Sequence, residues 1–316
     1  MPSCELWADL PRCMTSVLLT GGTGFIGGHL RLALRDQPVV LLGRSKPNLY
    51  RNERWANTNL AHAVPRETLE GSEVLCHLAY SMSSGRSNLN YNRHLIDAVN
   101  RCPDVRHVVL MSSTSVYGST TSAVVDEASP CTPVGEYAET KLACELAWRE
   151  ELRDNCALTV LRPSTVIGPN SVGLLSMIQD ALRRPILGPV KRSVLYHRSV
   201  HYVAVTNVIA AVLFSMHRER ATMREIYVVA DDHYPENKSY AAMQDAVRIS
   251  AGQRPWPGIA LPHRVLPLLG SLTNRPTLGL KRVFSSEKIH GAGFGDATTL
   301  YDEVKRTVAS FERYTV

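Results

Sequence analysis

Three short motifs carry residue types whose order along the chain suits oxidation and reduction of a small molecule. They are a glycine-rich turn, a serine that follows an apolar segment, and a Tyr-x-x-x-Lys pair. Their residues, in chain order, are Gly21, Gly24, Gly27, Ser113, Tyr137 and Lys141. A fold that brings the three motifs into one cleft would place a dinucleotide beside a proton donor, which is what hydride transfer requires.

The Tyr-x-x-x-Lys pair is predicted to supply the acid and base. Tyr137 and Lys141 share one face of a helix, because side chains four residues apart are neighbours there. A tyrosine ordinarily has a pKa of about 10, and a nearby ammonium together with an oxidised nicotinamide ring favours the phenolate. Tyr137 can then exchange a proton with substrate, Lys141 can also hold the nicotinamide ribose, and Ser113 can stabilise the substrate oxygen. The spacing also occurs in plain surface pairs, but the order of the three motifs favours catalysis.

The glycine turn predicts a phosphate site. Glycines lack the Cβ atoms that would keep a pyrophosphate away from the backbone, and the helix that begins there directs free N–H groups at an anion. A glycine triplet alone is also compatible with a tight turn. Its place between a first strand and an amphipathic helix favours a dinucleotide.

The end of the second predicted strand selects between dinucleotides. An acidic residue there holds a ribose 2′-hydroxyl, whereas this chain has Arg44 and Ser45, which suit a 2′-phosphate. NADP is therefore the predicted cofactor. NAD stays an alternative, because Arg44 can also be a solvated loop charge.

The elements that must position these residues follow from hydrophobic patterning. Strands are predicted at 16–20, 39–42, 74–78, 105–111, 158–162 and 225–229, and helices at 24–36, 88–100 and 137–152. This alternation predicts an α/β fold with a Rossmann-type, doubly wound parallel sheet. Further helices are predicted at 174–184, 206–217, 238–251 and 300–313, interrupted by Pro-rich loops such as 254–258. The predicted division is a dinucleotide-binding domain at 14–168, with returns at about 200–231, and a smaller C-terminal substrate lobe at 169–199 and 232–316.

Composition excludes several other classes of protein. The 316 residues are 44% hydrophobic and 20% charged, and no apolar run approaches the roughly 18 residues of a membrane span. The net charge of +6 is spread along the chain, which argues against a nucleic-acid partner. The seven cysteines are scattered, and no signal peptide precedes them, so we expect reduced thiols and a cytoplasmic protein without a bound metal. Met14, directly before the first strand, is a candidate initiator.

In these motifs the chain resembles the extended short-chain dehydrogenase/reductase family, in its NAD(P)-dependent sugar-nucleotide epimerase/dehydratase/reductase branch. The resemblance covers most of residues 15–230 and is carried by segments 20–27, 77–79, 112–118, 126–127, 137–145, 161–163 and 168–169. It implies that Ser113, Tyr137 and Lys141 form the catalytic triad and that the protein is a homodimer paired through the helix of Tyr137. It also implies dinucleotide contacts from Phe25, Ile26, Leu78, Ala79 and Pro163.

Departures from the family pattern narrow the reaction. Thr114 and Ser115 replace the acidic pair of the 4,6-dehydratases, so water elimination is disfavoured. Thr165 replaces a sugar-binding Asn, and Val200–His201 replaces an Arg-Asp pair. The substrate residues that remain as candidates are Ser115, Thr165 and Arg198, the last as a ligand for a diphosphate.

The resulting hypothesis is an NADP-dependent reductase of a keto group on a nucleotide-activated deoxysugar. One alternative is an epimerase that uses the same triad and retains its NAD, and another is a non-catalytic NADP sensor. The histidines His29, His77 and His201 are predicted to be packed and hydrogen bonded rather than metal ligands or acids. Cys76 and Cys144 are predicted to be buried small hydrophobes.

Overall fold

Seven strands form one parallel sheet in a computed structural model that describes residues 16–82, 85–218, 224–257 and 282–313. Their order across the sheet is β10-β7-β5-β4-β1-β2-β3. The strands are β1 (Ser16–Thr20), β2 (Val39–Gly43), β3 (Glu53–Asn57), β4 (Ser72–His77), β5 (His107–Met111), β7 (Ala157–Pro163) and β10 (Arg224–Val229). The strand order reverses between β1 and β4, and ligands bind at the carboxyl ends of strands beside such a reversal.

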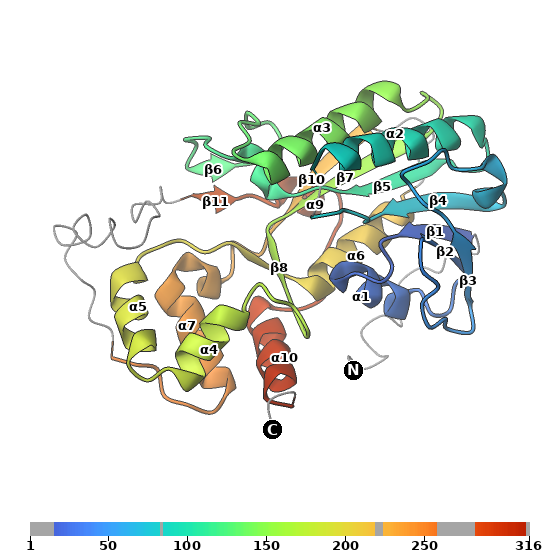
Figure 1. Ribbon diagram of the computed structural model, residues 1–316. Helices are drawn as coiled ribbons and strands as arrows, with labels where there is room; N and C mark the ends of the chain where they lie inside the picture. The colour runs from blue at the N-terminus through green and yellow to red at the C-terminus, as the bar shows by residue number, and fades with distance from the viewer. Residues whose placement is uncertain (1–15, 83–84, 219–223, 258–281, 314–316) are drawn as a thin grey trace.

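Helices cover both faces of the sheet (Figure 1). On one face lie α2 (Gly85–Arg101) and α3 (Glu136–Glu151), and on the other lie α1 (Phe25–Ala33) and α6 (Val205–Met216). Val17 and Leu19 of β1 pack with α1 and α6, whereas Leu18 packs with α2 and α3. This burial on both faces explains why the strand is a continuous apolar run rather than an alternating one.

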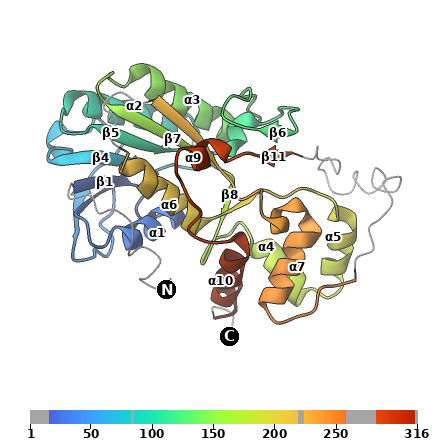
Figure 2. The ribbon, with the colours of Figure 1, turned by 180° about the vertical axis from the view of Figure 1, so that it is seen from behind.

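A second group of helices packs beside the sheet around its own apolar cluster. It consists of α4 (Leu175–Arg183), α5 (Leu187–Leu195), α7 (Tyr240–Ser250) and α10 (Leu300–Arg313). Ile178, Met243 and Val304 lie in the shared cluster. Figure 2 shows the group from behind, with α10 between the sheet and the other three helices.

Short elements connect the two groups. The parallel strands β8 (Thr165–Ile167) and β9 (Tyr202–Ala204) pair with one another, as do β6 (Val124–Val125) and β11 (Val283–Phe284). The remaining elements are the 3-10 turns η2 (Arg66–Thr68), η3 (Thr114–Tyr117) and η4 (Pro235–Lys238), and the helix α9 (Glu287–Gly291). Strand β8 crosses from the sheet toward the helices of the second group (Figure 1).

The predicted fold class is confirmed, and the differences lie in elements with weak local patterns. Strand β3 reads Glu-Arg-Trp-Ala-Asn and lies at the sheet edge, so it lacks the apolar run of a central strand. Helix α5 contains Gly188 and Pro189 near its start, which hide a helical pattern. Strands β8 and β9 are three residues long, too short for a periodicity.

Two side chains of the predicted C-terminal lobe lie elsewhere. Ile289 and Phe294 are buried in the cluster that α1 and α6 form on the sheet. The chain therefore returns to the sheet at α9 before it enters α10. The division between the domains otherwise stays a prediction.

Several predictions concern residues outside the described ranges, namely Met14, Cys4 and Cys13. The cysteines within those ranges, Cys76, Cys102, Cys131, Cys144 and Cys156, are free thiols. None of the helices in the described part of the chain is both long enough and apolar enough to cross a bilayer.

Candidate active site

The glycine turn joins β1 to α1, with Gly24 as the N-cap of the helix. Gly21 has a φ of +73°, and a Cβ on it would lie 2.7 Å from the Ala79 backbone nitrogen. A Cβ on Gly27 would lie 2.1 Å from the Gly21 carbonyl oxygen. Both positions therefore require glycine, and they let α1 begin directly against the end of β1 with its free N–H groups at the cavity described next.

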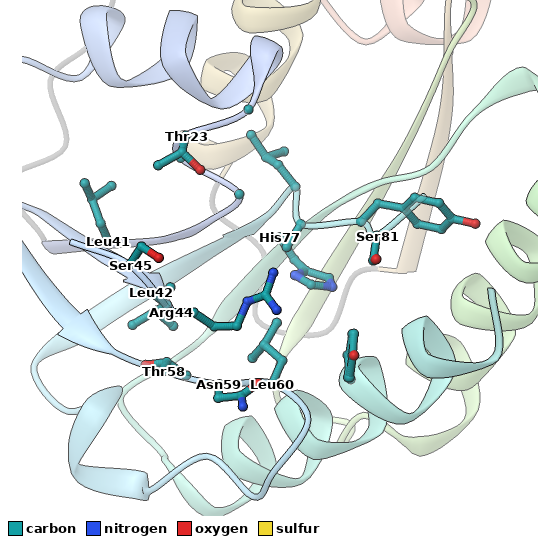
Figure 3. Close-up of a pocket in the computed structure, with 18 of the residues that line it drawn as sticks. Thr23, Leu41, Leu42, Arg44, Ser45, Thr58, Asn59, Leu60, His77 and Ser81 are labelled. Carbon is teal, nitrogen blue, oxygen red and sulfur yellow. The ribbon is translucent and has the colours of Figure 1, made fainter. Parts of the chain in front are cut away.

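A cavity of about 480 Å³ extends from the glycine turn past the end of β2. Figure 3 shows Arg44 extending into this cavity from the end of β2. Ser45 also lines it, as do Leu78 and Ala79. The described residues offer the Arg44 guanidinium no hydrogen-bond or ion-pair partner, so this cation faces the cavity unneutralised.

A second cavity, of about 800 Å³, lies on the other side of the same turn. It brings together twelve of the predicted residues: Gly21, Gly24, Phe25, Ile26, Gly27, Leu78, Ser113, Ser115, Tyr137, Lys141, Pro163 and Thr165. The two cavities share the glycine turn and Leu78. The arrangement forms a single crevice with the turn at its centre and the Tyr-Lys pair at one end.

Ser113 and Tyr137 contact one another at that end. Ser113 caps the turn η3 after β5 and accepts the Ser115 backbone N–H at 3.1 Å. Its hydroxyl hydrogen bonds the phenol of Tyr137, which lies in the first turn of α3 and is 39% exposed. The two hydroxyls are therefore positioned to meet one oxygen atom of a bound substrate.

Lys141 lies one helical turn further on and is buried. Its Nζ donates to the Met111 carbonyl at 2.9 Å and stands 4.4 Å from the centre of the Tyr80 ring. Tyr80 also packs edge-on against Tyr137, with 5.2 Å between ring centres. Burial lowers the pKa of Lys141 to about 8, although Cys144 and Glu145 oppose the shift.

The expected lowering of the Tyr137 pKa is not produced by the protein alone. Burial raises this pKa, and the hydrogen bond from Ser113 only partly opposes the rise. The Lys141 ammonium is engaged by the Met111 carbonyl and the Tyr80 ring. No cation among the described residues therefore lowers the pKa of Tyr137.

A buried ion pair holds the helix that carries Tyr137. Arg162 of β7 binds Glu145 of α3, with Nη2 to Oε2 at 2.6 Å and both side chains at most 2% exposed. Ser112 donates to the same carboxylate, and Arg162 donates to the Tyr117 hydroxyl at 2.9 Å. This network ties α3 to the ends of β5 and β7, so it positions Tyr137 and Lys141 relative to Ser113.

The predicted histidines are hydrogen bonded. His77 lies between Thr20 and Asn92, and its burial lowers its pKa to about 3, which keeps the ring neutral. His29 contacts the Phe25 carbonyl at 2.9 Å. His201 binds Asp232 and, unlike the other two, also lines the larger cavity.

Arg198 is the predicted ligand for a diphosphate, but the arginine that lines the larger cavity is Arg282. Arg198 lines neither cavity, whereas Arg282 lines the larger one and donates to the Gly118 and Thr120 carbonyls. Sequence reasoning missed Arg282 and Tyr80. Arg282 lies where the family resemblance has faded, and Tyr80 follows a motif whose pattern ends at Ala79, so no local signal marked either residue.

Residues 17–230 match a family model described as the NAD dependent epimerase/dehydratase family. UDP-glucose 4-epimerase from Lactobacillus helveticus is 29% identical over 184 residues, which is 50% of this chain and 53% of that protein. An uncharacterised UDP-glucose epimerase of Bacillus subtilis is 30% identical over 181 residues, 48% of this chain and 57% of that protein. The chain spans 53% to 62% of the length of the first curated relatives it matches.

Solved structures share the fold at lower identity. UDP-glucuronic acid 4-epimerase from Bacillus cereus, in complex with NAD, has a TM-score of 0.71 and 16% identity. That similarity covers 95% of this chain and 97% of the other. At this identity the likeness concerns the fold.

Proposed function

Since the chain belongs to the NAD dependent epimerase/dehydratase family, we propose that it interconverts a secondary alcohol and a ketone on a nucleotide-activated sugar. The observation that carries the proposal is the crevice itself. Ser113, Tyr137 and Lys141 line the same cavity as the glycine turn, as a dinucleotide-dependent proton relay requires.

The residues present fit a dinucleotide. The turn at Gly21 and Gly27 leaves no room for a Cβ, and the start of α1 offers backbone N–H groups to a pyrophosphate. Phe25, Ile26, Leu78, Ala79 and Pro163 are proposed to line its path. Lys141 is proposed to hold its nicotinamide ribose.

NADP is the proposed form of the dinucleotide. Arg44 and Ser45 line the smaller cavity at the end of β2, and the Arg44 guanidinium has no partner among the described residues. A guanidinium pairs well with a phosphate. Because the Arg44 guanidinium is unpaired, it loses no bond to the protein when it binds a phosphate.

When bound, the nicotinamide ring would supply or accept the hydride, and the chain would manage the proton. Tyr137 donates a proton to the substrate oxygen when a ketone becomes an alcohol, and it accepts that proton in reverse. Ser113 donates a hydrogen bond to the same oxygen and stabilises its developing negative charge. Arg282, rather than Arg198, is proposed to bind the diphosphate of the substrate, because it lines this cavity.

Net reduction is the preferred direction, since NADPH serves in most cells as an exchangeable reductant and Arg44 favours it. An epimerase that retains its dinucleotide is the second candidate. It is favoured by the names of the relatives, which include UDP-glucose 4-epimerases at 29% identity. Identifying any dinucleotide that co-purifies with the protein separates the two, because retained NAD without net consumption would indicate epimerisation.

The NADP proposal is tested by measuring the affinities of the Arg44→Ala variant for NADPH and NADH. Hydrogen bonds to charged groups contribute about 1.5–3 kcal/mol, so NADPH should bind about 10- to 100-fold more weakly while NADH is unaffected. Lys46→Ala, an exposed cation outside the cavity lining, is the control. An equal loss for both dinucleotides would contradict the proposal.

The reaction itself is tested by following NADPH absorbance with UDP- and dTDP-4-keto-6-deoxyglucose. Tyr137→Phe should lose about 10²- to 10⁴-fold in turnover and keep its affinity for NADPH. A wild-type protein that binds NADPH but turns over no sugar nucleotide would favour the sensor.

A further inference from the structure

His201 and Asp232 form a hydrogen-bonded pair on the wall of the larger cavity. His201 directly precedes β9, and Asp232 follows β10. The His201 Nδ1 lies 2.7 Å from Asp232 Oδ2, and the Phe284 backbone N–H donates to the same oxygen at 2.8 Å. The imidazole is 24% exposed and the carboxylate 3% exposed. The carboxylate is therefore shielded from solvent, while the ring faces the cavity.

The pair defines which nitrogen of His201 is available. A carboxylate accepts hydrogen bonds, so Nδ1 carries the proton and Nε2 keeps a lone pair in the neutral ring. No described residue hydrogen bonds Nε2. The His201 ring packs edge-on against Phe284, with 4.9 Å between ring centres. The backbone carbonyl of His201 accepts the Thr165 N–H at 3.0 Å. The structure thus presents an oriented imidazole base to the cavity.

The same cavity holds further polar atoms that lack protein partners. Ser164 is 6% exposed, and its hydroxyl has no hydrogen-bond partner among the described residues. The Ser115 hydroxyl is likewise buried without a partner there. Both serines line the cavity with His201. Buried polar groups are normally paired, so these two hydroxyls depart from the usual pattern, and neither oxygen is accessible from the cavity in this structure.

We propose that His201 Nε2 is a second acid–base atom of this cavity and exchanges a proton at the substrate carbon next to the carbonyl. The inference rests on the proposed function, because it needs a keto sugar in the cavity. Tyr137 and Ser113 already serve the carbonyl oxygen, and a hydride transfer needs one proton only. A second base would therefore act at a different atom of the substrate. The C–H bond next to the ketone is the remaining acidic position.

The proton transfer is balanced without an oxidant or a reductant. Nε2 takes the proton, the C–H electron pair becomes the C=C bond of an enolate, and the carbonyl π pair moves onto oxygen, where Ser113 and Tyr137 hold it. Return of a proton to the same carbon restores the ketone. Return from Nε2 gives isotope exchange, and return from the opposite face inverts that carbon.

The test measures deuterium entry at the carbons beside the carbonyl of UDP- and dTDP-4-keto-6-deoxyglucose. The full-length protein is incubated with each in D₂O, with oxidised NADP and no reductant, and proton NMR follows the loss of signal. Wild-type protein should promote exchange, and His201→Gln should slow it by about 100-fold or more. Asp232→Asn, which removes the carboxylate charge beside Nδ1, should slow it as well. His197→Gln, at an exposed histidine on the same loop that does not line the cavity, is the matched control.

Parallel NADPH oxidation with the same two compounds separates this inference from the proposed function. Reduction by wild-type protein without any enzyme-dependent exchange would overturn the role of His201 and leave the proposed function standing. Equal exchange by wild-type and His201→Gln proteins would overturn it too. If wild-type protein catalyses neither exchange nor reduction of either compound, both the role of His201 and the proposed function are overturned. Thermal unfolding that matches wild type shows that the variants fold. If His201→Gln does not fold, exchange by Asp232→Asn is the measurement that tests the role of His201.

Discussion

Lys141 shows how a single residue acquires its properties from its surroundings. Its ammonium is buried, with the Met111 carbonyl as acceptor and the Tyr80 ring above it. Burial lowers its pKa to about 8, so it can gain or lose a proton near neutral pH. At the same scale, burial raises the pKa of Tyr137. The two pKa values are thus shifted apart, that of Lys141 downward and that of Tyr137 upward, so direct transfer of the phenol proton to the amine is disfavoured.

The Lys141→Met variant should differ from wild type in how its stability depends on pH. In wild type the folded pKa is about 8 and the unfolded pKa about 10.5, so the penalty for burying the ammonium is full below pH 8. Between these values the unfolded chain holds a proton that the folded protein has released, and the unfolding free energy rises with pH. The wild type should therefore gain about 3 kcal/mol over the variant from pH 8 to 10.5.

Urea unfolding at pH 7.5 and pH 10 measures this difference. Lys46→Met, at an exposed lysine, is the control and should track wild type at both values. Parallel behaviour of wild type and Lys141→Met would show that Lys141 titrates as it does in the unfolded chain.

At the scale of elements, the site is made by the ends of strands and the starts of helices. The glycine turn packs α1 against the end of β1, and the Arg162–Glu145 pair fixes α3 to β7. Removing one partner of this pair should cost about 3–5 kcal/mol, because the other charge would be left buried without compensation. Tyr137 is exposed, but the Arg162–Glu145 contact that fixes its helix is buried.

Two adjacent glycines of α1 offer a matched test of the turn. A Cβ at Gly27 would lie 2.1 Å from the Gly21 carbonyl oxygen, whereas a Cβ at Gly28 has nothing within 4 Å. Gly27→Ala should destabilise the protein by about 1–3 kcal/mol and weaken NADPH binding, because backbone must move. Gly28→Ala should stabilise it by about 0.5–1 kcal/mol through helix propensity.

Thermal unfolding and a fluorescence titration with NADPH check both variants. Equal behaviour of the two alanine variants would mean that the turn adapts without cost, contrary to its packing in this structure.

At the scale of the whole molecule, two helical groups flank the crevice. One covers the sheet, and the other, around Ile178 and Met243, has its own apolar cluster. The larger cavity draws its wall from both the sheet and the connecting segments, since Ser113 follows β5, Thr165 begins β8 and His201 directly precedes β9. A shift of the second group would therefore alter the substrate end of the crevice.

Helices α2 and α3 pack together on one face of the sheet, and Leu146 of α3 is 40% exposed there. We expect this face to pair two copies of the chain. Sedimentation velocity should show a dimer for wild type and a monomer for Leu146→Arg, because a charge buried at an interface without a partner is costly. Ile249→Arg, at an exposed position of α7, should leave the dimer intact. A monomeric wild type would contradict the expectation.

The sequence by itself determined the parallel sheet, the glycine turn and the gathering of Ser113, Tyr137 and Lys141, because each depends on short-range patterns and on the rule that parallel strands end at one edge. Only the tertiary structure decided that Tyr80 covers Lys141, that Arg282 rather than Arg198 reaches the cavity, and that Asp232 meets His201. These contacts join residues far apart in the chain. They depend on how the segments that follow different strands meet at the ends of the sheet, which no local pattern encodes.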